Sequence, residues 1–270
     1  MAYRAPRYSY VHAAREAGVS AIDLDGDSAH ADFPIDNLID DRASTLFRFS
    51  GVVTDPNIDI DLGTETGINR LIIPANHNIS SIKVWQDGDV NFGTPWVCHN
   101  TDTSITPGVL YDSGEFDNLT QSQQHIRIDI TGTLQFQIPQ IILTKIKTLT
   151  VGPTLADSVD AKRDNVTRIV QNTGIHATIK HGPQQRYINY TYEYPLSSTD
   201  LATLEAMIDA VGMERPFWVD PASFSETPDT DDPPIWMLFR EMPEPRLSVL
   251  VPMAGQESKT FQLELIESVA

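Results

Sequence analysis

Asn57-Ile58-Asp59-Ile60-Asp61-Leu62 is the stretch that decides the fold class of this chain. Its polar and apolar side chains alternate with a period of two, which places the three apolar residues on one face of a strand. Gln124–Ile130 repeats this alternation, and Ile138–Leu143 has the composition of a closing strand. The first half of the chain is therefore predicted to be a β-sandwich.

The segments around this stretch follow a recognisable order. They are Asn37–Phe47, Asn57–Gly63, Ile68–Ile73, Ser81–Trp85 and His125–Ile130. In order and spacing they resemble the discoidin-like domain, which is also called the coagulation factor 5/8 type C or galactose-binding-like domain. The resemblance implies a jelly-roll β-sandwich. It implies less about function, because such sandwiches bind sugars, lipids or proteins.

The second half of the chain predicts strands around one helix. Tyr187–Tyr194 has Ile188, Tyr190, Tyr192 and Tyr194 on one face, which indicates a packed sheet face or, alternatively, a sugar-stacking platform. Leu201–Val211 has helical spacing after a serine N-cap, and Gly212 stands where the helix should end. Three apolar strands follow: Pro216–Pro221, Ile235–Arg240 and Lys259–Ile266. An α+β domain, a β-sandwich with one packed helix, is expected.

This order of elements is similar to that of the minor tail proteins of bacteriophages, in particular distal tail and tail-tube proteins. The residues that carry the similarity are Arg186–Ser197, Leu201–Gly212 and Pro216–Pro221. The resemblance implies a structural protein of the distal tail or baseplate that forms a symmetric ring, a trimer or hexamer, with other virion proteins as partners. Its location would be the virion tail, after assembly in the cytoplasm of the bacterial host. The start Met1–Arg7 has no apolar segment of a signal peptide, which agrees with this expectation.

Three segments are predicted along the chain. They are a discoidin-like domain over 1–150, a linker over 151–165, and a tail-type domain over 166–270. The linker is predicted because Gly152-Pro153 interrupts the sheet pattern and the residues after it are polar and without period.

Charge narrows the possible partners. The chain has 37 acidic and 19 basic residues and a net charge of −18. Such a surface repels nucleic acids and anionic membranes, so neither is expected as a partner. No apolar run approaches the length of a membrane span. The single cysteine, Cys98, excludes an intramolecular disulfide and a multi-thiolate metal site.

Catalytic patterns are absent from the sequence. It has no glycine-rich phosphate loop, nucleophile elbow, zinc-protease motif or C-x-x-C pair. Asp59 and Asp61 could form an acid–base pair, but strand alternation already explains their spacing. Cys98 and His99 are neighbours in sequence and so lie on opposite faces of a strand, which makes them unsuitable as a catalytic pair. The protein is predicted not to be an enzyme and to use no cofactor.

The alternative function is carbohydrate binding for host recognition. The discoidin-like resemblance implies loop aromatics that stack on a sugar ring, and here it points to Trp96 with His99 and His77. Phe92 and Asn78 are nearby in sequence. Trp85 lies within a strand and is expected to be a core residue.

Two further sites are considered. The resemblance implies a structural calcium ion held by Asp40 and Thr45, but Arg42 and Gln140 stand where acidic ligands are expected, so no metal is predicted. The acidic, proline-rich loop 225–234 is expected to reach a neighbouring subunit. The carboxylates assigned to assembly, in a wall that repels passing DNA, are Asp229, Asp231 and Asp232.

Overall fold

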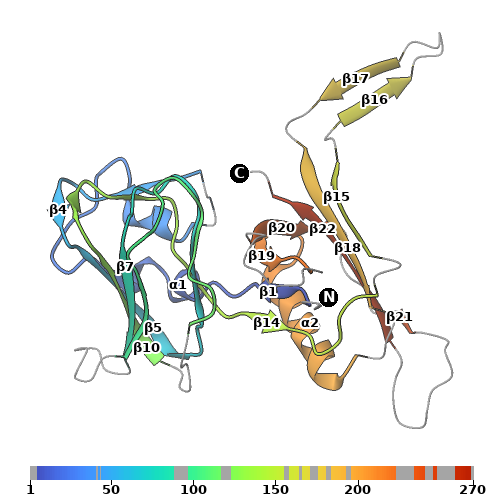
Figure 1. Ribbon diagram of the computed structural model, residues 1–270, viewed down its shortest axis with the longest axis horizontal. Helices are drawn as coiled ribbons and strands as arrows, with labels where there is room; N and C mark the ends of the chain where they lie inside the picture. The colour runs from blue at the N-terminus through green and yellow to red at the C-terminus, as the bar shows by residue number, and fades with distance from the viewer. Residues whose placement is uncertain are drawn as a thin grey trace. The chain divides into compact units, whose positions relative to one another are not determined.

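The protein is represented by a computed structural model that describes 5–40, 42, 44–87, 97–116, 123–154, 158–163, 166–170, 176–180, 184–192, 196–222, 234–240, 246–247 and 259–268. The chain forms two compact units. The first unit is Ser9–Ile146, and the second unit is Met1–Tyr8 together with Lys147–Val269. The predicted fold class is confirmed: the chain is mainly β, with a jelly-roll sandwich followed by an α+β unit (Figure 1).

The first unit contains mainly short antiparallel strands. Its elements are α1 (Ala13–Ala17), η1 (Val19–Ala21), β2 (Ile22–Asp23), η2 (Ile35–Leu38), β3 (Phe47–Arg48), β4 (Val53–Thr54), β5 (Asn57–Thr66), β6 (Arg70–Ile73), β7 (Ile82–Asp87), β8 (Val97–Asp102), β9 (Tyr111–Asp112), β10 (Gln123–Ile130), β11 (Thr133–Leu134), β12 (Gln137–Ile138) and β13 (Ile142–Thr144). A five-stranded sheet has the order β2-β5-β10-β7-β8, and a three-stranded sheet has the order β13-β6-β9. Two small pairs, β11-β4 and β12-β3, complete the sandwich.

The alternating stretches supply the core of the sandwich. In the antiparallel register of β5 and β10, Ile60 lies opposite Ile126 and Ile58 lies opposite Ile128. All four are buried in one hydrophobic cluster. The predicted inward face of these strands is therefore confirmed, because a period of two leaves no other way to bury the isoleucines.

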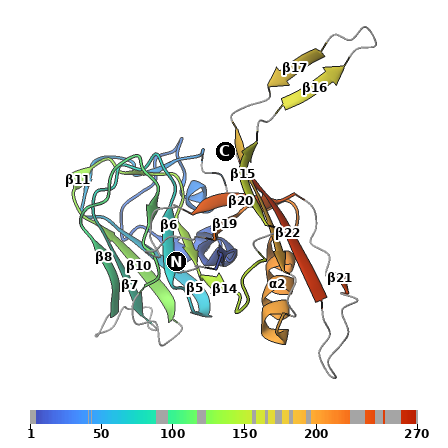
Figure 2. The same cartoon turned by 45° about the vertical axis from the view of Figure 1, so that its right-hand side comes forward.

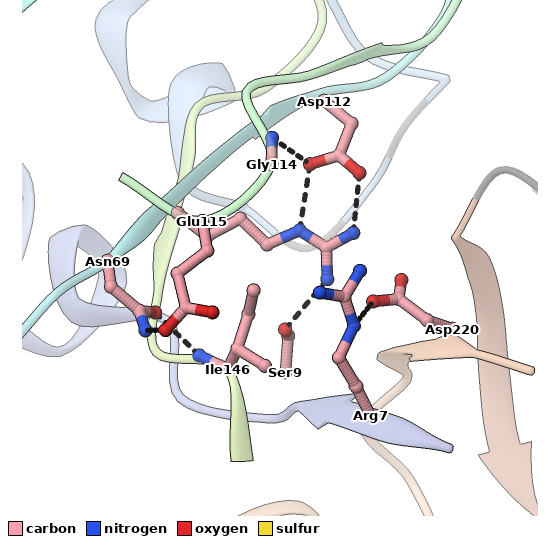
Figure 3. Close-up of polar contacts among 9 residues, drawn as sticks. Arg7, Ser9, Asn69, Asp112, Gly114, Glu115, Ile146 and Asp220 are labelled. Atoms are coloured by element: carbon pink, nitrogen blue, oxygen red, sulfur yellow. Dashed lines mark hydrogen bonds and ion pairs between the residues drawn. The ribbon is translucent and has the colours of Figure 1, made fainter. Parts of the chain in front are cut away.

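Polar contacts join the two ends of the first unit (Figure 3). The fully buried Arg70 donates two hydrogen bonds to the carboxylate of Asp112, at 2.8 and 2.6 Å, and a third to the hydroxyl of Ser9 at 3.2 Å. The neighbouring Asn69 accepts the backbone N–H of Ile146 at 2.7 Å. Ser9 and Ile146 are the first and last residues of the unit's main segment, so two adjacent side chains of the β6 region hold both.

The second unit is built on one antiparallel sheet. Its elements are β1 (Arg7–Ser9), β14 (Lys147–Thr148), β15 (Val159–Arg163), β16 (Val166–Val170), β17 (His176–Lys180), β18 (Gln185–Tyr192), α2 (Ser198–Val211), β19 (Phe217–Asp220), β20 (Ile235–Phe239), β21 (Arg246–Leu247) and β22 (Lys259–Glu267). The sheet has the order β14-β1-β19-β20-β22-β18-β15, with β21 also paired to β22. The strands β16 and β17 form a separate two-stranded sheet.

The tyrosine stripe of β18 is a packed face. Tyr190 and Tyr192 are buried, and the hydroxyls of Tyr192 and Tyr8 share a hydrogen bond of 2.7 Å. The hydroxyl of Tyr190 accepts the backbone N–H of Ala222 at 2.9 Å. The sheet-face interpretation is confirmed and the sugar-platform alternative is wrong for these two rings, since both are covered. Tyr194 lies outside the described residues.

The helix α2 has the ends that the sequence predicts. The hydroxyl of Ser197 accepts the backbone N–H of Asp200 at 3.1 Å, and Gly212 follows the last turn with φ +54°. The buried carboxylate of Asp200 also accepts the backbone N–H of Thr150 at 2.9 Å and its hydroxyl. Burial by itself would raise the pKa of Asp200, but these hydrogen bonds from Thr150 and Ser197 outweigh it and lower the pKa.

The predicted segment boundaries differ from the observed units. Strand β1, at the start of the predicted first domain, pairs with β14 in the second unit through Arg7 and Thr148. Strand β15 lies inside the predicted linker and pairs along β18. The sequence pattern misses β15 because an edge strand needs backbone partners rather than an apolar period. Its Asp160 instead pairs with Arg186 at 2.7 Å. Within the described ranges, no helix is long and apolar enough to cross a membrane.

Candidate functional site

The outer face of the five-stranded sheet carries a row of polar and aromatic residues. The strand registers pair Asp23 with Asp59, Asp59 with Arg127, and Arg127 with Trp85. The row therefore crosses β2, β5, β10 and β7, which lie in this order in the sheet (Figure 2 shows β5, β10 and β7). These positions alternate with buried isoleucines, so the row lies on the face opposite the core.

Trp85 is not a core residue, and the expectation that it would be is wrong. In β7 the buried residues are Ile82, Val84 and Gln86, so the position between the last two faces outward, and the side chain of Trp85 is only half-buried. Its indole N–H donates a hydrogen bond of 2.6 Å to Asp129. A place within a strand does not by itself decide burial, because alternate residues of one strand face opposite sides of the sheet.

Arg127 is fixed beside Trp85 by a two-point ion pair. Its guanidinium donates through Nε and Nη2 to the two carboxylate oxygens of Asp59. The hydrogen bonds that Arg127 donates to Asp59 raise the pKa of Arg127, which is therefore a permanent cation of the face. Both side chains are partly exposed, so their outer edges remain in contact with solvent.

The surroundings of Asp129 disfavour its charged form, whereas those of Arg127 favour its charged form. Burial raises its pKa, although the hydrogen bond from Trp85 and the charge of Arg127 both act to lower it. One of its oxygens accepts the indole N–H, while the other is buried and has no hydrogen-bond partner among the described residues. The carboxylate is thus held in place by a single ring, and it protonates more readily than an ordinary aspartate.

A second polar group stands at the end of the same face. Gln124 donates to the carboxylate of Asp61 at 2.9 Å, and the ring of His125 lies 3.7 Å from the same oxygen. The hydrogen bonds from Gln124 and from the backbone of Gly63 lower the pKa of Asp61. This carboxylate stays ionised and is about half exposed.

The face combines the groups that recognise sugars. A half-buried aromatic ring offers an apolar surface to the C–H side of a sugar, while carboxylates and a guanidinium hydrogen-bond to hydroxyl groups. The charge is unequal: among the described side chains on and beside this face, five carboxylates stand against two cations. They are Asp23, Asp25, Asp59, Asp61 and Asp129 against Lys83 and Arg127. The arrangement suits a polyhydroxylated ligand without negative charge.

Of the predicted sugar-binding residues, only His77 has a described side chain. His77 is buried, its Nε2 lies 2.7 Å from the carbonyl of Val109, and its Nδ1 accepts the backbone N–H of Ile79 at 3.2 Å. Burial lowers the pKa of His77, so it is a neutral ring that holds a turn. Of His99, only the backbone is described, within β8. Trp96 and Phe92 lie outside the described residues, as do Asp229, Asp231 and Asp232, the residues assigned to assembly.

The residues that the resemblance assigns to a calcium site form hydrogen bonds with one another. The hydroxyl of Thr45 donates to the carboxylate of Asp40 at 2.7 Å and to the carbonyl of Arg42 at 2.8 Å. The backbone N–H of Arg42 donates to the other carboxylate oxygen of Asp40 at 2.9 Å. Gln140 is fully buried, and its amide has no partner among the described residues.

This donor set does not fit calcium. It offers one carboxylate, a hydroxyl and a neutral amide, whereas calcium takes six to eight oxygens with several negative charges among them. Within the described ranges, no group of three His, Cys, Asp or Glu residues is placed to hold a metal ion.

We therefore expect millimolar EDTA to leave the melting temperature of the protein unchanged. The measurement is a thermal melt followed by circular dichroism, with and without EDTA, and again after excess calcium. Magnesium addition serves as the control for a general ionic effect. A fall of several degrees that calcium alone reverses would show that Asp40 and the amide of Gln140 do hold an ion.

The chain is similar in structure to several carbohydrate-binding modules. One is chitosan-binding module 1 of a chitosanase/glucanase from Paenibacillus sp. IK-5, at 18% identity over 45% of this chain and 92% of that chain, with a TM-score of 0.38. Another is the family 32 module from C. perfringens NanJ in complex with galactose, at 13% identity over 52% and 99%, with a TM-score of 0.40. A third comes from a family 31 glycoside hydrolase of Clostridium perfringens, at 12% identity over 49% and 99%, with a TM-score of 0.39.

No protein-family model and no curated protein matches the chain. At these TM-scores the structural similarity identifies no ligand and no site. The function must therefore be argued from the side chains of the outer face.

Proposed function

We propose that this protein is a non-enzymatic carbohydrate-binding protein and that its first unit binds glycan on the outer face of the β2-β5-β10-β7-β8 sheet. The observation that carries the proposal is Trp85, a half-buried ring on the outer face with its N–H fixed by Asp129. The Asp59–Arg127 pair stands next to it in the same row. Trp85 is the stacking surface, and the flanking polar groups bind hydroxyls.

The site is prepared before the ligand arrives. The indole donates a hydrogen bond to Asp129 and the guanidinium donates two to Asp59, so little side-chain freedom is lost on binding. Strands also position side chains more accurately than loops do. A single sugar ring bound in this way gains one stacking contact and a few hydrogen bonds.

The surplus of carboxylates decides the kind of sugar. An anionic sugar such as a uronate would be repelled by Asp129 and Asp61, whereas a neutral or amino-bearing sugar would not. We therefore assign neutral hexoses and amino sugars as the ligand class.

Replacing Trp85 with alanine should weaken binding at least tenfold, since truncating an aromatic anchor at the centre of a binding surface typically costs about 2 kcal/mol or more, and about 1.4 kcal/mol corresponds to a factor of ten in affinity. Calorimetry would compare oligomers of galactose, N-acetylglucosamine, glucosamine and galacturonate on the full chain. Trp236→Ala, which removes a half-buried tryptophan from the second unit, is the matched control. No binding of any probe at millimolar concentration, or equal binding by the Trp85 variant, would refute the proposal.

A second candidate is a structural protein of a bacteriophage tail, with virion proteins as partners. It is supported by the second unit, where β18, the capped helix α2 and β19 follow in the order that the tail-protein resemblance implies. The two candidates are compatible, because a tail protein that displays a glycan-binding unit would serve host recognition. Electron microscopy of particles labelled with an antibody to the purified protein tests this second candidate.

A further inference from the structure

The hairpin of β16 and β17 stands apart from the main sheet of the second unit. Its five residue pairs run from Val166 opposite Lys180 to Val170 opposite His176. In the part of the chain that the structure describes, neither strand pairs with a third. Figures 1 and 2 both show it beyond one end of β15 and β18, while α2 lies toward the other end. A two-stranded hairpin alone is marginally stable in water, so this arm needs a partner surface.

The arm is basic in an acidic protein. No Asp or Glu occurs between Asp164 and Glu193, although the chain has 37 acidic residues. The hairpin strands contain Arg168 and Lys180. A basic segment in a chain of net charge −18 is complementary to the rest of its own surface and to the surface of a second copy.

The helix α2 carries acidic side chains without basic ones, the reverse of the hairpin. Glu205 and Asp209 are exposed, are four residues apart and so share one side of the helix. Like charges at this spacing destabilise a helix, and acidic groups toward its C-terminal end oppose the helix dipole. The helix has no Lys or Arg, and neither carboxylate forms an ion pair with any residue in the described ranges.

Two small residues lie beside these carboxylates on the helix. The exposed Ala202 and Ala206 project only a methyl group each. Small residues leave room for a second backbone to approach the helix closely. An acidic helix face that is unfavourable for its own helix is the complement of a basic hairpin.

We infer that the β16–β17 hairpin of one copy of this chain docks on the exposed α2 face of a second copy. The contact is between copies, because the hairpin and α2 lie at opposite ends of the same sheet (Figure 1). The hairpin strands, about 17 Å long, are long enough to cover the two turns that carry Glu205 and Asp209. The two surfaces differ, so the contact is head-to-tail and closes into a ring or continues as a filament.

Sedimentation of the full chain tests this inference. We expect a concentration-dependent oligomer at low salt that weakens at least tenfold at about 0.5 M salt, because exposed charge pairs are screened. Two variants should each weaken association at least tenfold: Arg168→Glu with Lys180→Glu, and Glu205→Lys with Asp209→Lys. Lys145→Glu, an exposed charge reversal in the first unit, is the control and should leave association unchanged.

Mixing the two double variants gives the decisive result. Each variant alone carries two surfaces of like charge, but the mixture again presents opposite charges at every contact, so association should return. A wild-type chain that stays monomeric at low salt would overturn the inference. Association that survives both variants, or a mixture that stays monomeric, would overturn it as well. Glycan binding by the first unit is measured separately by calorimetry. Its loss or retention tests the proposed function and not the association between copies.

Discussion

Replacing Asp112 with alanine is expected to lower the free energy of unfolding of the first unit by about 3–5 kcal/mol, the usual cost of removing one partner of a buried ion pair. Arg70 is 0% exposed and donates two hydrogen bonds to the two carboxylate oxygens of Asp112 (Figure 3). The variant removes this counter-charge from a buried guanidinium.

Urea denaturation followed by tryptophan fluorescence measures this effect. The control is Asp160→Ala in the second unit, which removes a carboxylate from the solvent-accessible pair with Arg186 and should cost less than about 1 kcal/mol. Arg70→Met with Asp112→Leu should recover most of the loss, since an apolar pair of similar volume leaves no buried charge. Equal stability of the Asp112 variant and the control would mean that the pair contributes nothing.

Acid is expected to destabilise the first unit because of His12. This side chain is buried, caps α1 by accepting the backbone N–H of Arg15 at 3.2 Å, and has a pKa lowered from 6.5 to about 3. Burial is the main cause, and the charge of Arg15 adds to it. Between pH 6.5 and about pH 3, His12 is protonated in the unfolded chain but remains neutral in the folded unit.

The stability contributed by neutral His12 is therefore complete above pH 6.5 and falls toward pH 3. The slope is about 1.4 kcal/mol per pH unit, and the total loss is about 5 kcal/mol. His12→Asn keeps a side chain that can cap the helix and removes the titration. Denaturation at pH 7.5, 6, 5 and 4 should show a shallower decline for this variant. His77→Asn serves as a comparison, since burial also lowers the pKa of His77. An unchanged decline in the His12 variant would contradict the assignment.

The sequence predicts those elements whose signal is local. The isoleucines of β5 and β10 require one face each, and Ser197 and Gly212 mark both ends of α2. Strands β1 and β15 were missed because their evidence is a distant partner strand rather than their own composition. No local pattern shows that Arg7 pairs with Thr148 across most of the first unit.

The residues of the candidate site were not predicted from the sequence. The loop residues chosen for the sugar site include His77, whose two ring nitrogens bind backbone within the unit. The row that contains Trp85 needed the strand registers, which depend on pairings between β5, β10 and β7. The alternation along β7 indicates the outward position of Trp85, but not that Asp129 and Arg127 lie beside it.

The pairing of β1 with β14 has a consequence for how this protein can change. Tyr8 lies opposite Lys147 in neighbouring antiparallel strands, so the chain leaves the second unit and returns to it at adjacent points. The sandwich is therefore an insertion between β1 and β14, the two strands of a hairpin. A short turn would connect these strands if the insertion were removed. Exchange of this insertion for a different module leaves the surrounding sheet with the same strand pairs. The whole first unit can then be replaced in one recombination event while the second unit keeps its sequence.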